Sequence, residues 1–167
     1  MLGQQHALLT AIDDAQYTFH SELLQGSVGQ HTRHALDHLR KPLEAWLLLS
    51  GADVTIRYDL RARQTDVERD RTAAGDQIDA IHHNLDLIDD DALTSRVGAA
   101  FMLSGDGHEF VFDSTLSREL AFAVHHCIHH SALVKVLLRH HFPHVELPSD
   151  YGMAPSTLNY NATHPSA

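Results

Sequence analysis

The sequence predicts an all-α fold: a four-helix bundle with one small β-hairpin between the third and fourth helices and an irregular C-terminal tail. Four segments repeat apolar residues at the three- and four-residue spacing of helices that cover a core. The turn sequence Ser104-Gly105-Asp106-Gly107 separates two short apolar runs, as is typical of a hairpin. With 167 residues, 43% of them hydrophobic, we expect a single domain over residues 1–167.

Acidic residues mark a possible break in the first helix and the two ends of the third. The first is expected from Leu2 to about Leu24, and Asp13-Asp14 could divide it into two shorter helices. The third is expected to start at Thr65 or Asp66 and to end at Asp89-Asp90-Asp91.

The second helix is predicted between a serine cap and a glycine stop. Ser27 is the expected N-cap, and Gly51 ends the helix. Pro42 lies inside it and removes one backbone hydrogen bond, so we expect a kink there. The alternating, β-branched stretch from Asp53 to Tyr58 is then expected to be extended.

The hairpin and the last helix follow. The hairpin strands are predicted at Val97–Leu103 and Glu109–Phe112. Ser114-Thr115 caps a final helix over Leu116–Phe142, which contains neither Gly nor Pro. Residues from Leu147 to Ala167 show no periodicity and are expected to form the irregular tail.

Composition argues against several classes of partner. The net charge is −10 and no run is rich in Lys or Arg, so nucleic acid is not expected as a partner. No continuous apolar run approaches the roughly 20 residues that span a bilayer, and the start of the chain does not resemble a signal peptide. We therefore expect a cytoplasmic protein that does not bind membranes. The lone Cys127 cannot form an internal disulfide and is interpreted as a core residue.

Histidine is the residue type that points to chemistry, with 16 copies in the chain. Two pairs with helical four-residue spacing occur in the last helix, His125 with His129 and His126 with His130. Steps of three and four residues from the second pair reach mostly apolar side chains: Glu119, Phe122, Ala123, Leu133 and Leu137. His126 and His130 are therefore the pair expected to face the interior, where two neutral imidazoles can bind one divalent ion.

A second histidine cluster lies on the second predicted helix. His31, His34 and His38 follow one face at i, i+3 and i+7. One ligand from this face and two from the last helix would make a three-histidine site with one open position, as in catalytic metal centres. The apolar stripe is centred near Leu39 and Leu43, so periodicity alone favours His31 as the ligand.

Several segments together resemble the DinB-like (YfiT-like) family, specifically its small single-domain bacterial members. This family shares its name with a damage-bypass DNA polymerase of unrelated fold. The segments that carry the resemblance are Ser27–His34, Arg57–Arg63 with Glu68, Ser117–Phe122, His126–His130 and Tyr151–Leu158.

The resemblance implies a four-helix bundle with a three-histidine metal centre. The second-helix ligand is the eighth residue of a pattern that begins Ser/Thr-Ile/Val-Gly, which is His34 here, and the family's HxxxH pair corresponds to His126 and His130. We prefer this register because a pattern fixes position more sharply than a stripe centre, and we keep His31 as the alternative. The implied cofactor is a divalent transition metal: Zn, Ni or Fe.

Glu119 is the candidate catalytic residue, because it lies two turns before His126 on the same predicted face. A carboxylate there could hold a metal-bound water or orient a ligand ring. The alternative is an acidic residue that complements the helix dipole.

Two functions from different classes follow. The first is a metal-dependent enzyme that acts on a small molecule, in which the ion generates a hydroxide or thiolate for a transferase or hydrolase reaction. The resemblance implies a low-molecular-weight thiol as its substrate. The second is a non-catalytic metal-binding or stress-associated protein, with ions spread over surface histidines. A homodimer is left open.

Overall fold

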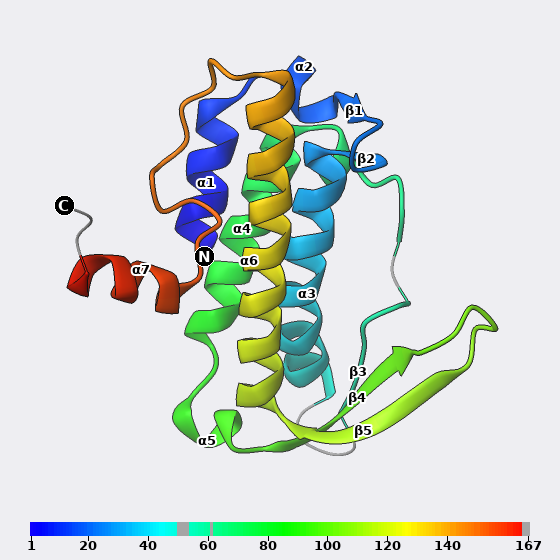
Figure 1. Cartoon of the computed structure of the whole chain (residues 1–167). Helices are drawn as coiled ribbons and strands as arrows, with labels where there is room; N and C mark the ends of the chain where they lie inside the picture. Colours follow the sequence, from blue (N-terminus) through cyan, green and yellow to red (C-terminus); the bar gives the residue numbers. More distant parts are fainter. Residues whose placement is uncertain (50–53, 61, 165–167) are drawn as a thin grey trace.

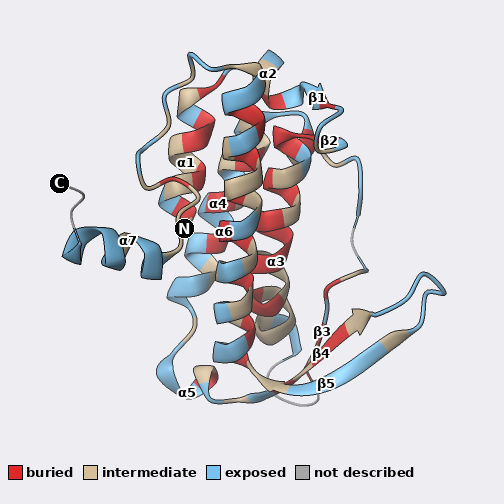
Figure 2. Cartoon of the chain, in the orientation of Figure 1, coloured by how far each residue is buried: buried red, intermediate tan, exposed pale blue. Residues whose placement is uncertain are grey.

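Long helices that run side by side make up most of the molecule (Figure 1). The computed structural model describes residues 1–49, 54–60 and 62–164. Helix α3 (Val28–Leu49) packs against both α6 (Leu116–His141) and α4 (Arg71–Asp86), and α1 (Leu2–Ala11) packs against α4. The main core lies between these helices, where Figure 2 shows their buried faces turned inward. The prediction of a mainly helical chain with a small sheet is confirmed.

Helix α3 starts at the predicted cap. Ser27 Oγ accepts a hydrogen bond from the Gln30 backbone N–H at 3.1 Å, and Gln30 Oε1 accepts one from the Ser27 N–H at 3.0 Å. This reciprocal pair satisfies two amides that a helix start leaves without partners. The helix continues through Pro42 as one element, and the predicted stop at Gly51 lies outside the described residues.

The first predicted helix is broken where the sequence suggested. Helix α1 ends at Ala11, and α2 (Asp14–Thr18) begins with Asp13 as a capping box. The prediction that helix continues to Leu24 is wrong. Two short antiparallel strands, β1 (His20–Ser21) and β2 (Gly26–Ser27), follow instead, and Gln25 takes a left-handed φ of 51° that turns the chain between them.

The predicted hairpin is part of a three-stranded sheet. Strands β4 (Arg96–Met102) and β5 (Glu109–Thr115) pair antiparallel, as predicted. Strand β3 (Thr55–Arg57) pairs parallel with β4 and gives the order β3-β4-β5. The sequence showed that this stretch is extended but not its partner, and its first predicted residue, Asp53, lies outside the described residues.

Two further corrections concern the acidic run and the tail. A short 3-10 helix, η1 (Asp66–Glu68), precedes α4, and Asp89 caps another short helix, α5 (Asp90–Leu93), rather than ending the third helix. The tail is not wholly irregular, because α7 (Pro155–Thr163) forms there. No residue of α7 is buried, so it has no apolar periodicity from which it could have been predicted.

Helix α6 is also long and apolar enough, by length and composition alone, to cross a membrane. No continuous apolar run in the sequence indicates this, because histidines interrupt the helix. A helix that lines a protein core passes the same test, and α6 packs along α3.

Candidate metal centre

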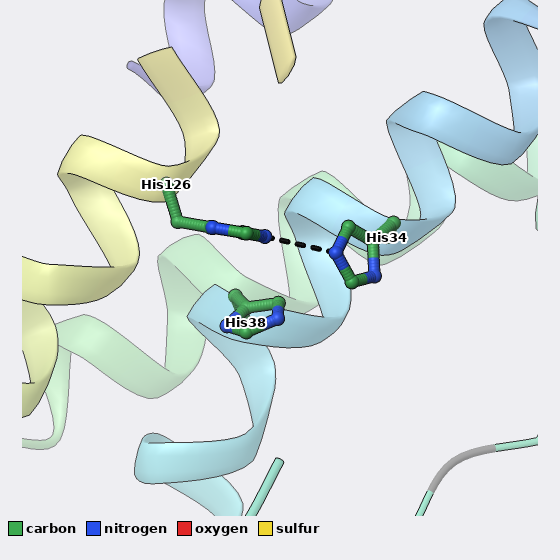
Figure 3. Close-up of side chains that lie close together, drawn as sticks. All are labelled: His34, His38 and His126. Carbon is green, nitrogen blue, oxygen red and sulfur yellow. Dashed lines mark hydrogen bonds between the residues drawn. The ribbon is translucent and has the colours of Figure 1, made fainter. Parts of the chain in front are cut away.

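Imidazoles from α3 and α6 meet where these two helices pack. His34 Nε2 lies 2.8 Å from His126 Nε2. Figure 3 shows the two rings pointing at one another, with His38 one turn along α3 beside them. One ligating nitrogen from each of these three residues lies within 4.8 Å of the other two. The structure therefore forms a histidine cluster from the two helices that the sequence predicted to supply ligands.

The other member of the predicted pair, His130, lies at the same place. Its ring centroid is 4.5 Å from that of His34 and 4.7 Å from that of His126. Its Nδ1 lies 2.9 Å from Nδ1 of His31. Both α3 histidines that competed for the ligand role thus contact the pair on α6, and His34 is the one next to both members.

The local sequence explains this placement. On α3, Ala35, Leu36 and Leu39 are buried, and on α6 Ala123 and Cys127 are buried. These side chains belong to the main core, and the histidines alternate with them along both helices. His31, His34, His126 and His130 are partly exposed, so a small molecule in solvent can reach them, whereas His38 is buried.

The electrostatics favour neutral imidazole, the form that ligates metal. Loss of hydration and, after it, the neighbouring His34, His126, His31 and His129 together lower the pKa of His130 to about 2. Burial, followed by the proximity of His129, also lowers the pKa of His31.

The spacing of the nitrogens suits a transition metal as well. Two nitrogens bound 2.0–2.1 Å from a tetrahedral ion lie about 3.3 Å apart. The His34–His126 separation of 2.8 Å needs only a small opening to reach that value. The donor set and its geometry therefore fit a divalent transition-metal ion.

Tyr58 fixes His38 from the side of the sheet. The two rings are stacked, with centroids 4.9 Å apart and an interplanar angle of 16°. The Tyr58 hydroxyl donates a hydrogen bond of 2.9 Å to Glu119 Oε2, and burial followed by the Glu119 charge raises the pKa of Tyr58. Phe122 of α6 packs edge-on against both Tyr58 and His38.

Glu119 is a fully buried carboxylate, and both of its oxygens accept hydrogen bonds. Besides Tyr58, it accepts hydrogen bonds from Ser114 Oγ at 2.5 Å and from Arg118 Nη1 at 2.8 Å. It reaches the cluster through Tyr58, which is consistent with a role in orienting a ligand ring. A catalytic role for Glu119 stays a prediction.

We expect Tyr58→Phe to lower the free energy of unfolding by about 1 to 2 kcal/mol, because a buried carboxylate loses one donor while the ring stack on His38 remains. Urea denaturation measures this change, with Tyr160→Phe as the control because Tyr160 is exposed. Equal stability of wild type and Tyr58→Phe would show that the Tyr58–Glu119 bond does not form.

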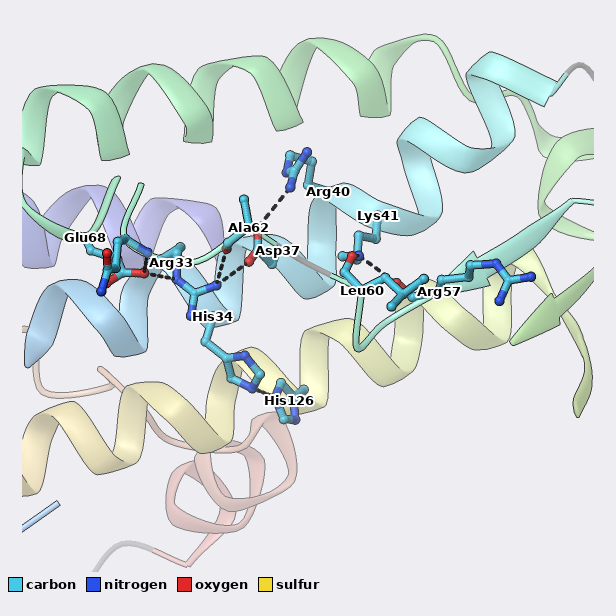
Figure 4. Close-up of polar contacts among 11 residues, drawn as sticks. Arg33, His34, Asp37, Arg40, Lys41, Arg57, Leu60, Ala62, Glu68 and His126 are labelled. Carbon is cyan, nitrogen blue, oxygen red and sulfur yellow. Dashed lines mark hydrogen bonds and ion pairs between the residues drawn. The ribbon is translucent and has the colours of Figure 1, made fainter. Parts of the chain in front are cut away.

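An ionic network lies next to His34, on the side away from His126 (Figure 4). Arg33 pairs with Glu68 through Nε at 2.7 Å and with Asp37 through Nη1 at 2.8 Å, and Arg40 also reaches Asp37, at 3.0 Å. The network ties η1 to α3 next to the ligand position. Because these groups neutralise one another, we assign them to positioning α3 rather than to binding an anion.

Cys127 is a core residue, as interpreted from the sequence. It is fully buried, and Gln5 Nε2 lies 3.7 Å from its Sγ. Burial raises the pKa of the thiol to about 11.

Native Cys127 should therefore react with iodoacetamide at pH 8 at least about 100-fold more slowly than in unfolded protein, because thiolate forms only as the pH approaches the raised pKa. Mass spectrometry of timed samples measures the rate. Fast alkylation of protein that stays folded would contradict the buried position.

Two residues of this site, His38 and Tyr58, were not predicted from the sequence to take part in it. His38 belongs to the i, i+3, i+7 pattern on α3, but neither the apolar stripe nor the family pattern indicates it as a ligand. Tyr58 could not be found, because its place beside His38 depends on the pairing of β3 with β4, which are about 40 residues apart in the chain.

Comparison with known proteins agrees with this description. The sequence profile of the DinB superfamily matches residues 3–134, which include all of α3 and the histidine pairs of α6. The chain belongs to the DinB superfamily. It is also similar to FK506-binding protein 5 of Rhizopus delemar, with 34% identity over 123 residues. That match covers 70% of this chain but 30% of the Rhizopus protein, so the chain spans less than a third of that relative's length.

Proposed function

We propose that this DinB protein is a metal-dependent enzyme whose centre binds a divalent transition metal, Zn, Ni or Fe, between α3 and α6. The observation that carries the proposal is the approach of His34 and His126 to 2.8 Å from two different helices, with further imidazoles beside them. His34 and His126 are the two ligands common to the geometry and to the family pattern. We further propose that α1, α3, α4 and α6 act as a four-helix bundle that holds them.

The third ligand is either His38 or His130. The distances between ring nitrogens support His38, because one nitrogen from each of His34, His38 and His126 lies within 4.8 Å of the other two. The family pattern supports His130, whose ring contacts both of the other ligands. Either choice gives three neutral donors and leaves a fourth position open, whereas all four histidines together would close a tetrahedral site.

The chain's own residues determine what such a centre can do. A bound ion supplies Lewis-acid chemistry that lowers the pKa of a water or thiol reaching it. Tyr58, held by Glu119, orients His38, and the partly exposed rings leave an approach from solvent. Uncharged ligands keep the positive charge of the ion available, which suits activation of a thiol for transfer or of water for hydrolysis. We propose a low-molecular-weight thiol as the small-molecule partner.

The test has two stages. Protein purified without an affinity tag should carry metal that is lost from the His34→Ala/His126→Ala double variant but kept when exposed His82 and His83 are replaced. Consumption of a low-molecular-weight thiol with an electrophilic acceptor should then follow the metal content. Metal that is retained in the double variant would contradict the proposed centre. Metal at this centre without turnover of either thiol or ester substrates would favour the non-catalytic metal-binding function.

A further inference from the structure

His31 and His130 face each other across the contact between α3 and α6. Their Nδ1 atoms lie 2.9 Å apart, which is hydrogen-bond distance for an N–H donor and a ring nitrogen acceptor. The ring centroids are 5.2 Å apart and the planes are tilted by 41°, so the rings meet through these nitrogens and do not stack. The other nitrogen of His31, Nε2, is buried and forms no hydrogen bond with any described residue. Among the described residues, His130 is therefore the hydrogen-bond partner of the His31 ring.

This contact links the tautomers of the two rings. A neutral imidazole has one N–H and one nitrogen with a lone pair, so one Nδ1 must donate and the other must accept. If Nδ1 of His130 donates, its Nε2 keeps the lone pair that a metal ion needs. If His31 donates instead, the proton of His130 lies on Nε2 and blocks that nitrogen. The direction of the hydrogen bond therefore decides whether Nε2 of His130 can be a ligand.

The His130 ring lies in a triangle with the rings of His34 and His126. Its centroid is 4.5 Å from that of His34 and 4.7 Å from that of His126, and the last two are 4.8 Å apart. A tetrahedral ion holds its ligands at equal distances from one another, and rings of nearly equal separation suit that arrangement. Because Nδ1 of His130 faces His31, the nitrogen that His130 has left for such an ion is Nε2.

We propose that His31 is a positioning residue: its Nδ1 accepts a hydrogen bond from Nδ1–H of His130 and so directs Nε2 of His130 to the metal ion between α3 and α6. This proposal rests on the proposed metal centre and takes His130 as the third ligand. A ligating histidine generally donates its second ring N–H to an acceptor, which fixes the ring and strengthens it as a ligand. Unlike a carboxylate acceptor, a neutral imidazole adds no negative charge, so the ion keeps its strength as a Lewis acid.

The affinity of matched variants for Zn²⁺ tests the role of His31. Exposed His82, His83 and His140 are replaced by Gln in every sample so that surface ligands do not compete. His31→Leu removes the acceptor and should weaken Zn²⁺ binding by about tenfold. His31→Asn has nearly the shape of the Leu variant but places an amide oxygen close to the position of Nδ1, so it should bind within about threefold of the starting protein. The control is His125→Leu on the exposed side of α6, which should not change the affinity.

Nuclear magnetic resonance of the zinc-loaded starting protein detects the hydrogen bond itself. With ¹⁵N-labelled histidine, His130 should show a proton on Nδ1 and a metal-bound Nε2. A scalar coupling between the Nδ1 nuclei of His130 and His31 should appear across the hydrogen bond, whereas a contact that only fills space would give none. This measurement does not depend on the folding of any variant.

The outcomes separate this proposal from the proposed centre. Equal Zn²⁺ affinity of His31→Leu and the starting protein overturns the positioning role, as does a metal-bound Nδ1 of His130, and both results leave the centre in place. Folded His31→Asn that binds as weakly as His31→Leu overturns the hydrogen bond as the cause. Zn²⁺ binding that survives the replacement of both His34 and His126 by Ala overturns the centre and this proposal with it.

Discussion

Replacing His34 with Ala should weaken metal binding by at least about tenfold, which corresponds to about 1.4 kcal/mol. His34 lies against both His126 and His130, so its loss removes a donor and also the contact that aligns the rest of the set. Competition with a chromophoric chelator measures the affinity. The control is His125→Ala, because His125 precedes a proposed ligand but is exposed.

This experiment also decides the register of the second-helix ligand. His31→Ala should weaken metal binding less than His34→Ala does. Full affinity in His34→Ala, together with loss in His31→Ala, would show that the periodicity of the apolar stripe identified the ligand and that the family pattern did not.

Gly29→Ala should lower the free energy of unfolding by about 3 kcal/mol or more. A Cβ at this position would lie 2.1 Å from the backbone oxygen of Glu68 and 2.9 Å from Cε1 of Tyr17, so η1 would have to move away from α3. That movement would also strain the Arg33–Glu68 pair next to His34.

Chemical denaturation of Gly29→Ala and Gly75→Ala measures the effect against a matched control. Gly75 lies inside α4 with no atom near the position of an added Cβ, so Ala there should be neutral or stabilising by up to about 1 kcal/mol. Similar stabilities for the two variants would mean that η1 does not pack against α3 as described.

Local sequence signals predicted the long helices and the hairpin well. The caps at Ser27 and Thr115, the break at Asp13 and the turn between the hairpin strands each depend on residues a few positions apart. The parallel pairing of β3 with β4 was not predictable in this way, because no local pattern records a partner so distant in sequence. Helix α7 was missed because it buries nothing.

In the candidate site, too, local patterns predicted which residues take part but not how their side chains are oriented. Helical spacing and the family pattern predicted His34, His126 and His130 as ligands, and the structure places these three rings side by side. Their role as ligands stays a prediction. The orientation of each ring determines which nitrogens face one another. Whether His130 faces His34 or His31 depends on side-chain rotation at the helix contact, and spacing along the chain does not determine it.

X-ray absorption spectroscopy of the zinc-loaded protein tests the central claim most directly. The account predicts a first shell of nitrogen or oxygen atoms at about 2.0–2.1 Å, with the outer-shell scattering of at least three imidazoles per ion and no sulfur at about 2.3 Å. In His34→Ala the imidazole scattering should fall by about one ring per bound ion. A shell with one imidazole or none, or a spectrum that His34→Ala leaves unchanged, would contradict metal binding by the α3–α6 histidines.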